Sequence, residues 1–481
     1  MKYKVLDLFA GGGGFSTGFQ MAELENSSFE VVRAVELNPD ACETLRAHLG
    51  DAKVIEGDIT SPEIKTQIIR ECNDVHVIIG GPPCQTYSLA GPSRSGKQEM
   101  REALKSDPRN TLFRHFFEIV NSIQPEVVVF ENVEGIISKQ LEHENEEELS
   151  EKQKLAIDVI CDELESIGYC TYLKERPGQR YQVLNAVDYG VPQQRKRVII
   201  IANRHGLVNP TPTKKVTNYR NLGQAIGNIP LVIPEINISR TNNLINMDIV
   251  INNFDQCVSA FANSIISLEN KKNNAPEIHS PEFKQIVTFI KDATPKLVKR
   301  KYKKLKSLVD FLIEFNILVE KYSQKHLADF PTFHSSRAHN IRDLAIFSMM
   351  KPGSSSAQFI NKDSELYDHL LNNLYPYDRT KHLDTYVRHA WYKPSNTILS
   401  HMEKDGLKFI HPDQPRTFTP FEAALIQTFP INYEFKGGRN AQYRQIGNAV
   451  PPLMAKSIGE SILKLLLSRS NSDRKAVAII N

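Results

Sequence analysis

The chain has 481 residues, more than one ordinary domain core requires, and its composition is that of a globular protein. Lys and Arg number 59 against 56 Asp and Glu, so the net charge of +3 gives no strong indication of a polyanionic partner. The six cysteines form no CxxC pair, which argues against a disulfide framework and against a metal site. Neither a signal peptide nor a membrane-spanning run is recognisable, so a soluble protein of a reducing compartment is expected.

Short β-branched runs alternate with segments of helical spacing in the first 200 or so residues. Strands are predicted at Lys4–Leu8, Val31–Val35, Val54–Ile55, Val75–Ile79, Val127–Phe130 and Val198–Ile201. Helices are predicted at Phe15–Glu25, Pro39–His48, Asn110–Ile123 and Lys152–Ile167. Such alternation predicts an α/β fold in which helices cover both faces of a parallel sheet.

The regular pattern fades after about Arg204. Lys291–Lys306 then carries eight Lys or Arg residues and one acid, and its interleaved apolar residues predict an amphipathic helix or helix pair. This segment is either an ordinary basic solvent face or a contact to nucleic-acid phosphates. Strand and helix patterns return near Lys381 and continue to a helix at Leu453–Ser468, and the tail Asn471–Asn481 is expected to fray.

A glycine run, Asp7-Leu8-Phe9-Ala10-Gly11-Gly12-Gly13-Gly14, follows the first predicted strand. Glycines let the backbone approach a ligand at the carboxyl edge of a sheet. Glu36 ends the second strand, where a carboxylate meets ribose hydroxyls in nucleotide-binding folds, and Asp58 could meet an adenine amino group. Ser16 or Thr17 takes the third position of the GxGxxG fingerprint, which favours an adenosine cofactor without phosphates, such as S-adenosylmethionine. A tight turn that binds no ligand is the alternative.

A single thiol follows the fourth predicted strand in Gly80-Gly81-Pro82-Pro83-Cys84-Gln85-Thr86-Tyr87-Ser88. The glycines and prolines stiffen the turn, so Cys84 is either a nucleophile beside the cofactor or a small buried side chain. Glu131 ends the next strand and could act as a general acid, unless it is a surface acid. Arg195 and Arg197 lie two apart, so in a strand both face one side and could hold a phosphate or pyrimidine carbonyl and orient Glu131. An exposed basic edge strand is the alternative for this pair.

Taken in order, these motifs resemble those of the DNA (cytosine-5)-methyltransferase family, in its bacterial restriction-modification branch. The matching segments are Asp7–Gly14, Glu36, Gly80–Gln85, Glu131–Val133, Gln193–Arg197, Arg416–Thr419 with Glu422, Gln427, Phe429 and Pro430, and Gln445–Pro452. The resemblance covers about Tyr3–Asn203 and Asp384–Ile462.

That resemblance implies a Rossmann-like, S-adenosylmethionine-dependent methyltransferase domain with a mixed, mostly parallel sheet. It also implies a smaller target-recognition domain inserted before the C-terminal motifs. The domains expected are 1–205, the N-terminal part of the catalytic domain; 206–383, the DNA-binding target-recognition domain; 384–470, completing the catalytic domain; and 471–481, the tail. The middle region is long enough for a lobe that reads the major groove.

The activity implied is methyl transfer from S-adenosylmethionine to carbon 5 of a flipped-out cytosine in a specific double-stranded DNA sequence, through a covalent Cys84 intermediate. The implied catalytic residues are Cys84, Glu131, Arg195 and Arg197. The implied cofactor contacts are Phe9, Gly11, Gly13, Glu36, Asp58, Pro82, Leu112, Asn448 and Val450. The DNA contacts expected are Gln85, Ser88, Lys299, Arg300 and Lys301, and no metal is expected.

The partners expected are double-stranded DNA and a cognate restriction endonuclease that acts separately, in a bacterial cytoplasm and without a membrane. No long extension precedes the first motif, which favours the prokaryotic branch. Two alternatives stay open: a tRNA cytosine-5 methyltransferase of the same family, and a catalytically idle DNA-binding relative. The long insertion argues against the tRNA enzyme, and a nicotinamide-dependent oxidoreductase would leave the Cys84 motif unexplained.

Overall fold

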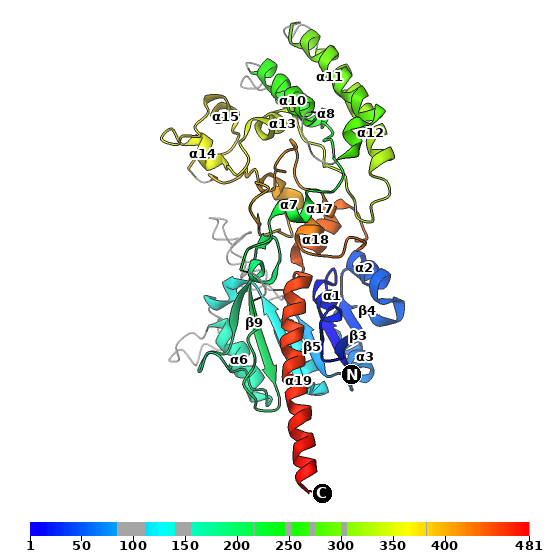
Figure 1. Ribbon diagram of the computed structural model, residues 1–481, viewed down its shortest axis with the longest axis vertical. Coiled ribbons are helices and arrows are strands. Elements are labelled where there is room, and N and C mark those ends of the chain that lie inside the picture. Colours follow the sequence, from blue (N-terminus) through cyan, green and yellow to red (C-terminus); the bar gives the residue numbers. More distant parts are fainter. Residues whose placement is uncertain are drawn as a thin grey trace. The chain divides into compact units, whose positions relative to one another are not determined.

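The computed structural model describes residues 1–83, 112–139, 155–214, 217–245, 253–269, 275–299, 305–380 and 382–480 (Figure 1). The chain forms two compact units. Unit 1 comprises Met1–Tyr219, Gln427–Ala441 and Asn448–Asn481, and unit 2 comprises Arg220–Ile426 and Gln442–Gly447. Both ends of the chain therefore belong to unit 1, and the segment 384–470 is divided between the two units.

Unit 1 is built on an eight-stranded sheet of order β2-β3-β1-β5-β6-β9-β7, with β4 paired to β3. The strands are β1 (Lys2–Leu8), β2 (Glu23–Leu24), β3 (Ser27–Glu36), β4 (Val54–Glu56), β5 (Val77–Gly80), β6 (Val127–Asn132), β7 (Gln182–Asn185) and β9 (Lys196–Asn203). Strands β4, β3, β1, β5 and β6 run parallel, whereas β9 is antiparallel to β6 and β7, and β2 to β3. The predicted mixed, mostly parallel sheet is confirmed.

Helices cover both faces of this sheet because successive strand residues point to opposite sides. Val5 and Val77 face α1 and α19, whereas Leu6 and Ile78 face α3, α5 and α6. The helices of unit 1 are α1 (Gly14–Gln20), α2 (Pro39–Leu49), α3 (Pro62–Glu71), α5 (Leu112–Ile123), α6 (Ala156–Ser166) and α19 (Pro452–Ile480). Figure 1 shows α19, in red, alongside the sheet strands.

The helix predicted at Phe15–Glu25 is too long, because α1 ends at Gln20. Glu25 and Asn26 both have positive φ, 48° and 59°, and turn the chain between β2 and β3. The sequence patterns also missed α3 and β7. Helix α19 continues to Ile480, through most of the segment expected to fray.

Unit 2 is mainly helical. Its helices are α7 (Leu222–Ile226), α8 (Ile238–Ile245), α10 (Phe254–Leu268), α11 (Pro281–Lys299), α12 (Leu305–His326), α13 (Ile341–Met349), α14 (Ser356–Ile360), α15 (His369–Leu374), α16 (Met402–Asp405), α17 (Pro420–Ile426) and most of α18 (Arg439–Asn448). Two short strands also occur, β8 (Gln193–Gln194) of unit 1 and β10 (Ser395–Asn396) of unit 2. Helices α11 and α12 confirm the helix pair predicted around Lys291–Lys306.

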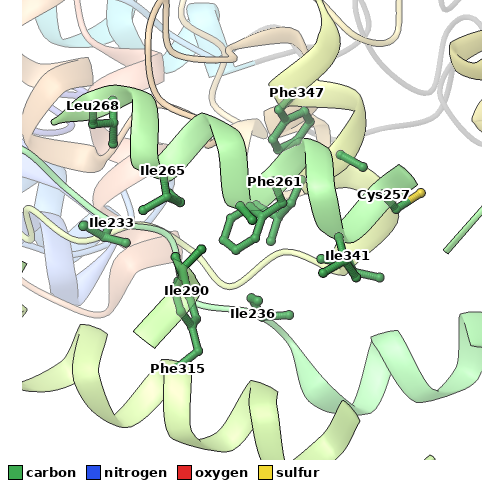
Figure 2. Close-up of a cluster of buried hydrophobic side chains, with 14 of the residues drawn as sticks. Ile233, Ile236, Cys257, Phe261, Ile265, Leu268, Ile290, Phe315, Ile341 and Phe347 are labelled. Atoms are coloured by element: carbon green, nitrogen blue, oxygen red, sulfur yellow. The ribbon is translucent and has the colours of Figure 1, made fainter. Parts of the chain in front are cut away.

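The core of unit 2 forms around one face of α10 (Figure 2). Cys257, Phe261 and Ile265 recur every four residues and lie on that face. They belong to one buried cluster with Ile290 of α11 and Phe315 of α12. Among the residues described, no helix is both long and apolar enough to cross a bilayer.

Candidate active site

Four neighbouring parallel strands, β3, β1, β5 and β6, end at one edge of the sheet. Each is followed or ended by a predicted site residue. Glu36 ends β3, Phe9 and the glycine run follow β1, Gly81 and Pro82 follow β5, and Glu131 is the last but one residue of β6. The strand order therefore gathers residues that are far apart in the sequence.

The loop after β1 is held by the carboxylate of Glu36. Phe9 and Gly11 adopt positive φ, 60° and 54°, which turns the chain sharply at the strand end. The Gly11 N–H donates to Glu36 Oε2 at 2.8 Å, and the N–H groups of Leu37 and Asn38 donate to Oε1 at 3.0 and 2.9 Å. A Cβ on Gly11 would meet no atom within 4 Å, so this side of the loop is open. Oε2 accepts one of these three bonds, which leaves it capacity for a ribose hydroxyl.

The later glycines of the run are required by packing. A Cβ on Gly13 would lie 2.5 Å from Tyr433 Oη, and one on Gly14 would lie 2.3 Å from the Val450 carbonyl oxygen. The Tyr433 hydroxyl also donates to the carbonyl of Gly12 at 2.9 Å. The C-terminal segment thus packs against the N-terminal loop, as expected, and Gly13 is accounted for by Tyr433.

The other predicted cofactor residues differ in exposure. Pro82 and Val450 are buried, Leu112 is half-buried at the first position of α5, and Asp58 and Asn448 are exposed. Asp58 follows Gly57, whose N–H donates to the Glu36 carbonyl at 3.0 Å, so it lies beside the end of β3. The Asp58 carboxylate accepts from Thr60 N–H at 2.9 Å.

Glu131 is buried and directly contacts two predicted site segments. Its Oε1 lies 2.7 Å from Arg197 Nε. A Cβ on Gly81 would lie 2.6 Å from its Oε2, so only glycine lets the loop after β5 pass this close. Burial raises the pKa of the Glu131 carboxyl, and the positive charges of Arg197 and Arg195 oppose that shift. The loop that carries this glycine reaches Cys84 three residues later.

The two arginines expected on one strand face differ in depth. Arg197, in β9, forms the ion pair with Glu131. Arg195, just before β9, is fully buried, and its Nη2 donates to the Ala449 carbonyl at 2.9 Å. Ala449 lies between Asn448 and Val450, so Arg195 connects the Glu131 side of the site to the predicted cofactor segment.

Several neighbours of the site were not predicted to have a role there. Asp7 is buried at the end of β1, accepts from Ser16 Oγ at 2.5 Å, and has its pKa raised to about 7 by burial. Asn132 Nδ2 donates to the Pro82 carbonyl at 3.2 Å, which fixes the loop after β5 against β6. Asp7 and Asn132 lie within the motifs quoted above, but their partners are visible only in the fold.

Four of the described cysteines are unsuited to act as a nucleophile. Cys42, Cys72, Cys161 and Cys257 are buried, and burial raises the pKa of each thiol to about 12, which makes the thiolate scarce. Cys84, Gln85, Ser88, Arg300 and Lys301 lie outside the described residues, and so does the Lys299 side chain, although Lys299 ends α11.

Comparisons with known proteins identify the family of this chain. Residues 3–464 match the family described as C-5 cytosine-specific DNA methylase. The Type II methyltransferase M1.HphI of Haemophilus parahaemolyticus is 27% identical, over 97% of this chain and 88% of its own length. The Type II methyltransferase M.DdeI of Desulfomicrobium norvegicum is 29% identical, over 95% of this chain and 88% of its own length.

A crystal structure of a DNA modification methyltransferase encoded within an E. coli prophage shares the fold, with a TM-score of 0.55 and 19% identity over 96% of this chain and 99% of that one. The family match, over residues 3–464, includes residues of all three segments that build unit 1. The chain therefore belongs to the C-5 cytosine-specific DNA methylase family and is an S-adenosylmethionine-dependent DNA cytosine-5 methyltransferase.

Proposed function

We propose that the chain methylates carbon 5 of a flipped-out cytosine in one double-stranded DNA sequence, through a covalent bond to Cys84. The observation that carries the proposal is the buried Glu131–Arg197 pair, in which Glu131 lies against Gly81. Gly81 comes three residues before Cys84. A carboxyl group and a guanidinium are thereby held next to the loop that carries the thiol.

The cofactor side of the site suits an adenosine cofactor that carries no phosphate groups. Glu36 Oε2 would accept from a ribose hydroxyl, and the open side of Gly11 would let the ligand approach the backbone. Phe9, Asp58, Pro82, Leu112, Asn448 and Val450 are the further proposed contacts. When bound, S-adenosylmethionine supplies an electrophilic methyl group.

Cys84 makes carbon 5 of cytosine nucleophilic. Its thiolate adds to carbon 6. As the carbon–sulfur bond forms, the electron pair of the carbon 5–carbon 6 double bond shifts to the bond between carbons 5 and 4, and negative charge builds on ring nitrogen 3. Carbon 5, now part of an enamine, would take the methyl group as the bond from that group to the sulfonium sulfur breaks, and the electron pair of the broken bond would stay on the sulfur of the departing thioether. Loss of the carbon 5 proton then re-forms the double bond and expels the Cys84 thiolate.

Glu131 and Arg197 stabilise the charge that builds on the ring during thiolate addition. Burial raises the pKa of the Glu131 carboxyl, which favours its role as a proton donor to ring nitrogen 3. Arg197 keeps Glu131 in place through Nε and would bind the exocyclic carbonyl. Arg195, being fully buried, acts by positioning these groups.

The reacting atoms of a stacked base are inaccessible, so the target cytosine must leave the duplex, at a cost of about a few kcal/mol. Gln85 and Ser88 would contact DNA beside the thiol, and Lys299, Arg300 and Lys301 would contact phosphates from the region 206–383. Because curated relatives are Type II methyltransferases, the biological role we propose is to protect host DNA from a separate restriction endonuclease.

Replacing the thiol tests this function. Cys84→Ser should abolish methyl transfer to duplex DNA and leave equilibrium DNA binding unchanged, because a hydroxyl is a far weaker nucleophile. Bisulfite sequencing of DNA from cells that express the wild-type chain should show 5-methylcytosine at one sequence, and the Cys84→Ser chain should leave none. An active Cys84→Ser enzyme would overturn the mechanism. Methylation of tRNA with none of duplex DNA would favour the tRNA enzyme, and DNA binding without any transfer would favour an idle relative.

A further inference from the structure

A basic cavity lies in unit 2, and none of its lining residues has been assigned a role above. Its volume is about 330 Å³, and segments distant in the sequence line it. Arg240 comes from α8, the stretch from Arg337 to Asp343 leads into α13, Tyr377 follows α15, and Lys404 and Leu407 lie in and after α16. All of these residues belong to unit 2, so the cavity is formed within one unit.

Local packing keeps the cavity walls in place. The α13 wall begins at Asn340, whose side-chain oxygen accepts from Asp343 N–H at 2.9 Å and caps the helix. The Ile341 N–H donates to Thr241 Oγ1 at 3.4 Å, which ties this wall to α8. On the other side, a Cβ on Gly406 would lie 3.1 Å from Arg337 Nη1, so glycine leaves room for that guanidinium.

The cavity concentrates positive charge. Its described lining contains four cations, Arg240, Arg337, Arg342 and Lys404, and one acid, Asp343, a formal excess of 4 − 1 = +3. The whole chain of 481 residues carries the same net charge. An excess of this size in so small a lining favours an anionic ligand.

The one acid in the described lining is fully engaged within the wall. Arg342 Nε and Nη2 donate to Asp343 Oδ1 at 3.2 and 3.0 Å, and the Tyr386 hydroxyl donates to the same oxygen at 2.8 Å. Asn340 Nδ2 donates to Oδ2 at 2.7 Å. With Asp343 occupied in this way, the donors of Arg240 and Lys404, both exposed, are the groups that a ligand would meet.

We propose that this cavity binds a backbone phosphate of the DNA substrate and so positions unit 2 on the duplex. The proposal rests on the proposed function, because that function makes duplex DNA the polyanion that unit 2 meets. Guanidinium and ammonium groups are the usual partners of DNA phosphates, and such contacts hold a protein in register without reading sequence. The sequence pattern pointed instead to Lys299–Lys301, so the cavity adds a contact formed only by the fold.

The test is the salt dependence of DNA binding without cofactor, in the full-length protein. Arg240→Gln and the double variant Arg240→Gln/Lys404→Gln remove exposed charges, and Lys362→Gln removes an exposed lysine that does not line the cavity. Each phosphate contact contributes about 0.9 to the slope of log affinity against log salt. We expect the slope to fall by about 0.9 in the double variant, which loses the phosphate contact, and by less in the single variant. The fall should be equal for cognate and unrelated duplexes, and the slope should stay unchanged in Lys362→Gln.

Unchanged slopes in both cavity variants would overturn the proposal. A loss confined to the cognate sequence would also overturn it, because the cavity would then contact bases. Equal thermal midpoints for all variants would exclude misfolding. Methyl transfer by the wild-type chain is measured separately. If the wild-type chain transfers methyl groups but the salt slopes of the cavity variants are unchanged, only the cavity proposal is refuted. If the salt slopes fall in the cavity variants but the wild-type chain transfers no methyl groups, only the catalytic proposal is refuted.

Discussion

At the scale of single residues, Arg195 and Arg197 make different contacts, although their spacing suggests one shared role. Alternation along a strand predicts that both face the same side, and both do influence the pKa of the Glu131 carboxyl. Depth separates them, since Arg197 pairs with Glu131 and Arg195 reaches the Ala449 carbonyl. One guanidinium therefore adjoins the reacting base in our proposal, and the other braces the cofactor segment.

Substitution of Arg195 should separate its charge from its hydrogen bond. Arg195→Met removes a positive charge near Glu131, so the pKa of that carboxyl should rise further, and the fall of kcat at alkaline pH should move to higher pH. Arg195→Lys keeps the charge, so its kcat should fall at the same alkaline pH as that of the wild type. Both variants lose the bond to Ala449, worth about 1.5–3 kcal/mol, so KM for S-adenosylmethionine should rise by about tenfold to a hundredfold.

The measurements are pH profiles of kcat and the KM for the cofactor in the three proteins. Arg195→Lys is the matched control for folding, because it retains a buried cation. If kcat falls at the same alkaline pH in Arg195→Met and Arg195→Lys, Arg195 has no electrostatic influence on Glu131. An unchanged KM in both would contradict the positioning role.

At the scale of elements, the close contact of α1 with α19 joins the two ends of the chain within unit 1. A Cβ on Gly18 would lie 2.3 Å from the Ala455 side chain and 2.5 Å from the Pro452 carbonyl oxygen. Gly18→Ala should therefore force α19 outward and lower the free energy of unfolding by about 1–3 kcal/mol. Since Val450 and Asn448 lie just before α19, cofactor affinity should fall as well.

Gly438→Ala is the control for this substitution, because a Cβ there would meet no atom within 4 Å. Urea unfolding and equilibrium cofactor binding are the two measurements. Equal stability of Gly18→Ala and Gly438→Ala would show that the α1–α19 contact tolerates a methyl group and is looser than the distances imply.

These elements also show how far sequence patterns reach. Glu36 and Glu131 could be placed from sequence because each ends a β-branched run, and strand ends of a parallel sheet gather at one edge. Tyr433 could not, because it contacts Gly12 across 421 residues and lies outside every quoted motif. The depth of Arg195 was equally hidden, since spacing fixes the face of a strand and packing fixes burial.

At the scale of the whole molecule, the two units should respond differently to acid. In unit 2, burial lowers the pKa of His334 and His389 to about 4 and that of His411 well below its usual 6.5. Neutral histidines in the fold become cations in the unfolded chain, so their contribution is complete above pH 6.5 and is lost as the pH falls towards 4. In unit 1, burial also lowers the pKa of His48 and His205, but the raised pKa of Asp7, about 7, acts oppositely, because its stabilisation grows as the pH falls from 7 towards 3.8.

Unit 2 should accordingly unfold first on acidification. Trp391, the single tryptophan of the chain, lies in unit 2 with its ring centroid 5.1 Å from that of His411, so its fluorescence reports on this unit. Each buried histidine shifted from 6.5 to about 4 costs on the order of 3 kcal/mol of stability by pH 4. Between pH 6.5 and 4, the urea midpoint of Trp391 fluorescence should therefore fall faster than that of far-ultraviolet circular dichroism, which reports on both units.

A variant identifies the groups responsible. His389→Gln removes one titrating side chain, which stacks on Phe409 and hydrogen-bonds to the Lys408 carbonyl, and glutamine can still donate to that oxygen. Its stability should therefore fall by about 1.4 kcal/mol less per pH unit than that of the wild type over this range, whatever its stability at pH 7. Coincident fluorescence and dichroism transitions at every pH would contradict separate responses of the units. If the stability of His389→Gln changes with pH as steeply as that of the wild type, His389 does not contribute to the acid response. One fewer proton taken up on unfolding must make the dependence of stability on pH less steep.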